Sequence, residues 1–234
     1  MRSLVAALSL VLLSAVYCKH GCLKGTHHKA APGPETGMQA CHLYANSSCC
    51  HSNFTEKISP SPLIQIDHFY WNRCGNLSKL CEDYMKKIEC FYQCSPLTAH
   101  WAHPNISVAI QSVPLCRNFC DGWFEACRAD LVCAHNFITD WTYDESGNQC
   151  KNDCVPYSKM FANGTDLCES AWGSSFVVST SPCRCLDMTE TDSNVVKYIL
   201  EGEHSEESGE EQACKPRLQG PPRKKDPDQD DEDD

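Results

Sequence analysis

The sequence predicts one disulfide-rich globular domain that is mainly α-helical, with short β segments and long loops. Nineteen of its 234 residues are cysteines, and such a fraction is near that of disulfide-stabilised scaffolds. Apolar residues recur at helical spacing in several segments, whereas the strict alternation that marks a half-buried strand is rare. The length of the chain allows one large domain or two small ones.

Two segments show clear helical periodicity. In the first, which begins at Asn76, apolar positions recur at steps of three and four: Leu77, Leu80, Cys81, Tyr84 and Ile88. Pro114 opens the second, where apolar residues stand four apart at Leu115, Phe119, Trp123 and Cys127. Proline costs little in a first helical turn, because its missing N–H has no intrahelical partner there. We expect a helix in each segment.

Two further helices and two short strands complete the expected elements. Thr165 is placed to cap a helix that runs to Trp172, and Asp192 or Ser193 to cap another that contains the apolar residues Val195, Val196, Ile199 and Leu200. The N-terminal third is rich in Gly, Pro and His, so we expect it to be mostly loop. The strand candidates are residues 63–66 and 176–178.

The two ends of the chain differ from its body, which we place at residues 19–200. Residues 1–18 combine Arg2 with an apolar stretch too short to span a bilayer comfortably, which is typical of a secretory signal peptide. Residues 201–213 are predicted to be an acidic loop and residues 214–234 a disordered charged tail, because like charges repel and few apolar residues are present. Neither a later membrane span nor a lipid-anchor signal is present, which predicts a secreted protein without a membrane anchor.

Charge and sequons agree with secretion. The formal net charge is −11, which argues against nucleic acid as a partner. Residues 190–234 carry 6 basic and 15 acidic side chains, so −9 of this charge lies in the last fifth of the chain. Among five Asn-X-Ser/Thr sequons, Asn53 and Asn163 lie in polar, turn-like stretches and are the preferred glycosylation sites. The remaining candidates are Asn46, Asn76 and Asn105.

The cysteine spacing favours structural disulfides over a metal or redox site. Cys90/Cys94, Cys116/Cys120 and Cys150/Cys154 are C-x-x-x-C pairs. On a helix this spacing puts both sulfurs on one face, where each would bond a different segment. Zinc sites and thioredoxin-like sites favour C-x-x-C, which does not occur in this sequence. The spacing alone leaves the pairing open.

No catalytic or metal-binding motif stands out. The ten histidines form no H-E-x-x-H pattern, and neither a nucleophile elbow nor a phosphate-binding loop is present. We therefore expect no metal, no cofactor and no enzyme activity. Aromatic residues are frequent in the body of the chain. Most are expected in the core, but such a set also suits a pocket for a flat, apolar ligand.

Three segments resemble the folate receptor and riboflavin-binding protein family. They are WNRCGNLSKLCEDYMKKIECFYQCSP, SVPLCRNFCDGWFEACRADLVCAHN and CVPYSKMFANGTDLCESAW. The resemblance extends from about Cys22 to Cys214. It implies the fold of that family and a soluble, monomeric binding protein. What it carries would be riboflavin or a folate, and neither would act as a catalytic cofactor.

Three local features of the resemblance favour riboflavin. Ile88 stands where folate receptors carry the Asp that binds the pterin. The stretch 102–112 lacks the basic residues of their aromatic-basic segment, and Ile138 and Thr139 replace their His-Lys pair. An anionic glutamate tail would thus lose its cationic partners, whereas the neutral isoalloxazine ring needs none.

The resemblance also implies which residues contact the ligand. The isoalloxazine ring would stack between Tyr92 and Trp172, with Trp71, Trp141 and Phe137 as neighbours. Phe137 departs from the riboflavin-binding pattern, which has Trp at this position. It remains flat and apolar, so we expect a modest effect.

A disulfide map and a phosphorylated loop complete what the resemblance implies. Ser205 and Ser208 each fit the S-x-E pattern of secretory kinases, and in the family a phosphoserine cluster in this loop serves uptake into the oocyte through a receptor. The implied disulfides are Cys22–Cys49, Cys41–Cys90, Cys50–Cys94, Cys74–Cys154, Cys81–Cys127, Cys116–Cys185, Cys120–Cys168, Cys133–Cys150 and Cys183–Cys214.

Four hypotheses follow for the function. The leading one is a secreted riboflavin carrier that delivers the vitamin to the egg. A soluble folate or pterin binder is the alternative within the family. A storage glycoprotein without a ligand and an enzyme are the other two, and the enzyme has no candidate nucleophile or base.

We predict that the mature protein contains no free thiol. Cleavage after Cys18 removes one of the 19 cysteines and leaves an even number for disulfide pairing. A thiol-reactive dye, applied to the secreted protein under denaturing, non-reducing conditions, should label no residue. One labelled cysteine would show that the cleavage site lies elsewhere.

Overall fold

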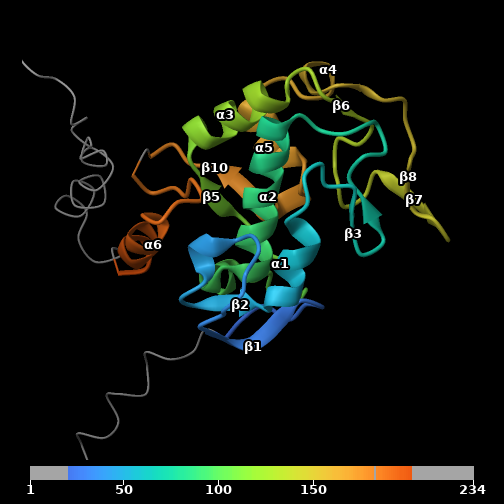
Figure 1. Cartoon of the computed structure of the whole chain (residues 1–234). Helices are drawn as coiled ribbons and strands as arrows, with labels where there is room; N and C mark the ends of the chain where they lie inside the picture. The colour runs from blue at the N-terminus through green and yellow to red at the C-terminus, as the bar shows by residue number, and fades with distance from the viewer. Residues whose placement is uncertain (1–20, 182, 202–234) are drawn as a thin grey trace, which may run out of the picture.

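Helix α2 (Lys79–Cys94) runs through the middle of the molecule, and the other elements surround it (Figure 1). The computed structural model describes residues 21–181 and 183–201. Helix α3 (Arg117–Cys127) packs against α2, and α5 (Gly164–Ser170) packs against α3. The core lies between these helices and contains the fully buried Trp123, Phe91 and Leu167.

Helix α2 forms where the periodicity predicts it, although it begins three residues after Asn76. Ser78 precedes its first turn, and the Ser78 hydroxyl donates a hydrogen bond to the Asp130 carboxylate at 2.8 Å. Leu80, expected on the core side, is 67% exposed, because the buried face is centred on the following residue. The residues of that face are Cys81, Glu82, Met85, Ile88, Cys90, Phe91 and Cys94.

The start predicted for the second helix is wrong. Pro114 lies in strand β5 (Val113–Leu115), which pairs in parallel with β10 (Phe176–Val178), and α3 begins only at Arg117. The Pro114 carbonyl accepts the N–H of Leu186 at 2.8 Å, so the segment is held by tertiary pairing. Strand β10 confirms the second strand candidate.

The third and fourth helices are present with different starts. Asn163 caps α5 by accepting the Asp166 N–H at 3.0 Å, so the expectation that Thr165 is the cap is wrong. Helix α5 also ends two residues before Trp172. In α6 (Asp192–Glu201), Asp192 is the first helical residue, and its carboxylate accepts the N–H of Met188 at 2.9 Å.

The described strands pair two by two and form no larger sheet. Strand β3 (Gln65–Ile66), within the first strand candidate, forms a tight hairpin with β4 (Phe69–Tyr70). The other pairs are β6 (Leu131–Val132) with β9 (Val155–Pro156) and β7 (Trp141–Asp144) with β8 (Gly147–Cys150). The short helices between them are η1 (His42–Tyr44), η2 (Pro96–Trp101), α4 (Tyr157–Met160) and η3 (Gly173–Ser175).

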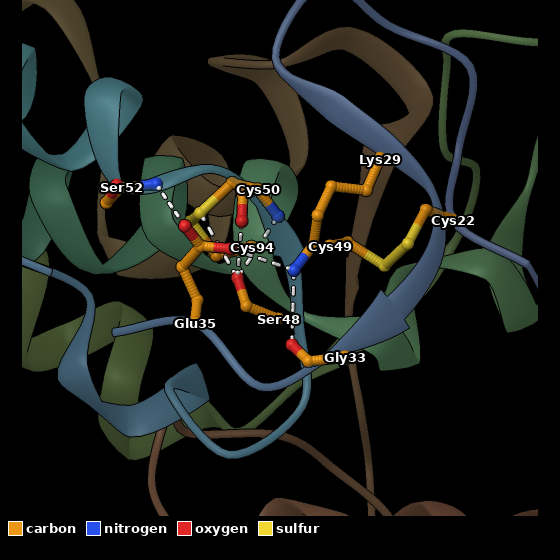
Figure 2. Close-up of polar contacts among 9 residues, drawn as sticks. All are labelled: Cys22, Lys29, Gly33, Glu35, Ser48, Cys49, Cys50, Ser52 and Cys94. Carbon is orange, nitrogen blue, oxygen red and sulfur yellow. Dashed lines mark hydrogen bonds and ion pairs between the residues drawn. A yellow bond between two sulfur atoms is a disulfide. The ribbon is translucent and has the colours of Figure 1, made fainter. Parts of the chain in front are cut away.

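The N-terminal third is more ordered than the loop that its composition predicts. Strand β1 (His28–Gly33) pairs antiparallel with β2 (Ser48–Cys50), and α1 (Ser52–Ile58) follows directly. Figure 2 shows the Glu35 carboxylate accepting the N–H of Ser52 at 2.9 Å, where an anion stabilises a helix start. Tertiary contacts, which composition does not report, order this region.

Eight disulfides connect the described residues, and each joins two cysteines that the resemblance pairs. Cys90 and Cys94 extend from one face of α2 to Cys41 and Cys50, as expected for C-x-x-x-C on a helix. The pair Cys150/Cys154 also bonds two different partners, but no helix contains it. The bonds to the N-terminal third explain why that region is ordered.

Several predicted features lie outside the described residues. They are the signal peptide 1–18, most of the acidic loop 201–213 with Ser205 and Ser208, the tail 214–234, and Cys214 as the partner of Cys183. Within the described part of the chain, no helix has both the length and the apolar character that a membrane crossing requires.

We predict that Gly164→Ala destabilises the domain. A Cβ atom at Gly164 would lie 2.5 Å from the Cys120 carbonyl oxygen and 2.6 Å from the Asp121 nitrogen, so α5 would have to move away from α3. Overpacking of this kind lowers the free energy of unfolding by about 1–3 kcal/mol. Urea denaturation measures the change. Gly33→Ala, where a Cβ would meet nothing within 4 Å, is the matched control; equal stability of both variants would contradict the prediction.

Candidate functional site

A cleft with a volume of about 880 Å³ opens beside the C-terminal half of α2. Such a volume lies in the upper part of the range of small-molecule sites. Its walls are α2, the β3–β4 hairpin, the N-terminal residues 25–27 and three segments, 103–110, 137–143 and 172–176. Sequence-distant parts of the chain therefore meet in this one cleft.

Tyr92 lines the cleft from the last turn of α2. Its hydroxyl donates a hydrogen bond to the Val108 carbonyl at 2.5 Å, and its carbonyl oxygen lies 3.0 Å from His28 Nε2. The His28 ring meets the Tyr92 ring edge to face at 5.4 Å. Burial, followed by the nearby Glu89 carboxyl, raises the pKa of Tyr92. The ring is thus fixed in place.

Trp172 and Phe137 line the same cleft and contact each other. Their rings meet edge to face at 5.4 Å, and the Phe137 N–H donates to the Ala171 carbonyl at 2.7 Å. Phe137 is 6% exposed. The structure therefore brings Tyr92 and Trp172 to one cleft, with Phe137 beside Trp172.

Of the other two expected neighbours, Trp71 lines the cleft and Trp141 does not. Trp141 packs edge to face on Phe69 at 5.4 Å, and its indole N–H donates to the Phe137 carbonyl at 3.1 Å. With Trp71 and Phe137 it lines an adjoining, half-open pocket of about 40 Å³. Trp141 therefore supports residues of the cleft wall from behind.

The sequence did not predict the polar residues at one end of the cleft. They are His27, Asp67, Glu89 and Gln93. Desolvation by burial raises the pKa of Glu89, whereas hydrogen bonds from Lys57 and then His27 lower the pKa of Asp67. One signal existed: Glu89 precedes Tyr92 by three residues, which places both on one face of a helix.

The described walls of the cleft include three histidines, His27, His68 and His103, but neither Lys nor Arg. Ile88 lines the cleft and is 2% exposed. Segment 103–110 contributes the exposed apolar residues Ile106 and Val108 to the rim. The interior thus suits a flat, largely neutral ligand better than a polyanion.

Two disulfides close the base of the segment that carries Phe137 and Trp141. The sulfurs of Cys74, Cys133, Cys150 and Cys154 all lie within 4.8 Å of one another. Four such sulfurs would suit a metal only as thiolates, and here they pair as Cys74–Cys154 and Cys133–Cys150. Their role is to hold the cleft wall.

Comparison with known proteins shows the family of the chain that forms this cleft. A family model described as the folate receptor family matches residues 21–187 of the chain. The chain belongs to the folate receptor family. Its disulfide-rich domain, with short strands around a few helices, is the domain that this match covers.

Individual relatives fall into two groups. The riboflavin-binding protein of Dromaius novaehollandiae is 55% identical over 201 residues, which cover 86% of this chain and 84% of that protein. The riboflavin-binding protein of Gallus gallus is 57% identical over 191 residues, 81% of this chain and 80% of that protein. Human folate receptor alpha is 29% identical over 177 residues, 71% of this chain and 68% of that receptor. The chain is thus much more similar to the first group.

We predict that Asp140 stabilises the loop that presents Phe137. The Asp140 carboxylate accepts the N–H groups of Asn136 at 2.8 Å and His135 at 3.1 Å. The bond from Asn136 is the main cause of its lowered pKa. Asp140→Ala should reduce the free energy of unfolding by about 1 kcal/mol at pH 7.

The pH dependence of this difference gives a second readout. A lowered pKa in the folded state stabilises the fold above the unfolded-state pKa of about 3.9, and this contribution is lost as the pH falls through the folded-state value. Urea denaturation from pH 7 to pH 2 should show the gap between wild type and Asp140→Ala closing in acid. Asp121→Ala, an exposed position on α3, is the control; a gap that persists at pH 2 would contradict the assignment.

Proposed function

We propose that the protein is a secreted, non-catalytic carrier of riboflavin. The observation that carries this proposal is the cleft that Tyr92 and Trp172 both line, whose described walls contain neither Lys nor Arg. The similarity to two riboflavin-binding proteins, at 55% and 57% identity, supports the same ligand.

In this proposal the isoalloxazine ring stacks between Tyr92 and Trp172. Offset stacking of aromatic rings adds about 0.5–1.5 kcal/mol per pair beyond the burial of apolar area. Phe137, Trp71 and Ile88 supply apolar surface around the ring. The hydrogen bond from Tyr92 to Val108 and the contact of Phe137 with Trp172 hold these groups in place before the ligand binds.

A soluble folate or pterin binder is the second candidate, because folate receptors belong to the same family. The lining of the cleft argues against it. An anionic glutamate tail needs cationic partners when it leaves water, and the described lining offers none from Lys or Arg. The apolar Ile88 stands at the position where the resemblance places the pterin-binding Asp.

Secretion and delivery to the oocyte form the physiological part of the proposal. The five sequon asparagines, Asn46, Asn53, Asn76, Asn105 and Asn163, are all exposed, as glycosylation requires. We propose that a receptor recognises the acidic loop, with Ser205 and Ser208 phosphorylated, and that the carrier is monomeric. The enzyme hypothesis has no supporting feature in the cleft.

The test is a titration of riboflavin fluorescence with the purified apoprotein. Stacking between two rings should quench the flavin at a ratio near one to one, and excess folic acid should not restore the emission. Trp172→Ala should weaken binding at least tenfold, about 1.4 kcal/mol. Trp101→Ala, a tryptophan that does not line the cleft, is the matched control.

Two outcomes would overturn the proposal. An apoprotein that leaves riboflavin fluorescence unchanged is not a riboflavin carrier. Recovery of the emission by folic acid at a similar concentration would instead support the folate or pterin binder.

A further inference from the structure

We propose that the polar end of the cleft, formed by His27, Asp67, Glu89 and Gln93, binds the hydroxylated side chain of the flavin. This inference rests on the proposed function and assigns a different part of the ligand to residues that the aromatic site leaves unused. All four residues line the same cleft as Tyr92.

Glu89 is a partly buried member of this polar end. It lies one helical turn before Tyr92, and its Oε1 accepts a hydrogen bond from Gln93 Nε2 at 3.0 Å. Its other carboxyl oxygen accepts no hydrogen bond from a described residue. This oxygen is not sealed from solvent, so it can accept a hydrogen bond from a hydroxyl group of a ligand that enters the cleft.

His27 and Asp67 form a second contacting pair in this polar end. His27 Nε2 and Asp67 Oδ2 are 2.7 Å apart, and the His27 side chain is 12% exposed while that of Asp67 is 40% exposed. Lys57 donates to the other oxygen of Asp67 at 2.5 Å and keeps this carboxylate in place. The pair thus combines a mostly buried imidazole with a more exposed carboxylate.

This arrangement fits a chain of hydroxyl groups better than the polar edge of a ring. A hydroxyl donates one hydrogen bond and accepts others, so it matches carboxylate acceptors, the Gln93 amide and an imidazole equally well. A planar ring edge presents its donors and acceptors in one rigid plane. The four residues instead come from three places, namely the N-terminal segment, the β3–β4 turn and α2, so a flexible polyol can reach them from different directions.

The position next to Tyr92 also fits the geometry of the ligand. In riboflavin the ribityl chain begins at the ring itself. A ring held against Tyr92 would therefore start its chain within reach of Glu89, which lies one turn away on the same helix, and of the Gln93 amide that bonds the Glu89 carboxyl.

The experiment compares riboflavin with lumiflavin, which has the same ring but a methyl group in place of the ribityl chain. Affinities of the full-length secreted apoprotein for both flavins are measured by fluorescence quenching. Glu89→Leu should weaken riboflavin binding about tenfold or more, the size expected for lost hydrogen bonds, and should change lumiflavin binding less than about threefold. Glu89→Gln keeps an acceptor and a donor and should bind riboflavin nearly as wild type does.

Controls separate folding from binding. Glu125→Leu, an exposed acidic residue on α3, should change neither affinity. Thermal unfolding checks each variant, and Gln93→Leu replaces Glu89→Leu if the latter does not fold. The same selective loss of riboflavin is expected.

Every other outcome would overturn either the polyol site or the proposed function. Equal losses for both flavins would assign Glu89 to the ring edge and overturn the inference, and unchanged affinity for both would exclude contact with the ligand. A wild-type protein that binds neither flavin would overturn the proposed function itself, whereas one that binds both with equal affinity would remove only the polyol site.

Discussion

Three disulfide bonds tie helix α2 to the rest of the described chain. Cys81 bonds α3 through Cys127, while Cys90 and Cys94 bond the N-terminal third through Cys41 and Cys50. Cross-links of this kind restrict the unfolded chain and stabilise a native domain by about 2–4 kcal/mol each, without being additive. They matter here because the described strands form only pairs and the core rests on a few short helices.

The same helix forms the one regular, disulfide-anchored wall among the described walls of the cleft. Ile88, Glu89, Tyr92 and Gln93 line the cleft from α2, and every other wall is a loop, a short strand or the short helix η3. Those loops are held individually. Tyr92 bonds segment 103–110 at Val108, and the two disulfides of Cys74, Cys133, Cys150 and Cys154 close the base of the segment with Phe137. An irregular architecture can therefore present a defined aromatic site.

The sequence predicts the parts of this molecule that depend on local spacing. Helices α2, α3, α5 and α6 were foreseen because an amphipathic helix repeats its pattern within a few residues. Their starts were less predictable, since Pro114 is held by pairing with β10 and Asn163 competes with Thr165 as a cap. Strand β1 was missed because its order depends on β2 and on bonds to α2.

The residues of the site likewise fall into two groups, those that the sequence indicated and those that it did not. Resemblance to the family pointed to Tyr92, Trp172, Phe137 and Trp71, and the structure brings these four to one cleft, with Trp141 behind it. Resemblance, and not spacing, supplied the disulfide pairs. The polar end was not predicted because His27, Asp67 and Glu89 line one cleft only in the folded chain, so no sequence motif joins them.

Cross-linked walls have a consequence for the kinetics of binding. Ordering a flexible site at each encounter would cost conformational entropy and weaken the complex. Here both the N-terminal segment and the Phe137 segment are attached covalently to the framework, so most of that ordering takes place during oxidative folding. A ligand that arrives later meets walls whose separation the sulfur bonds already limit, and its residence time then depends on the contacts within the cleft and not on reassembly of the cleft.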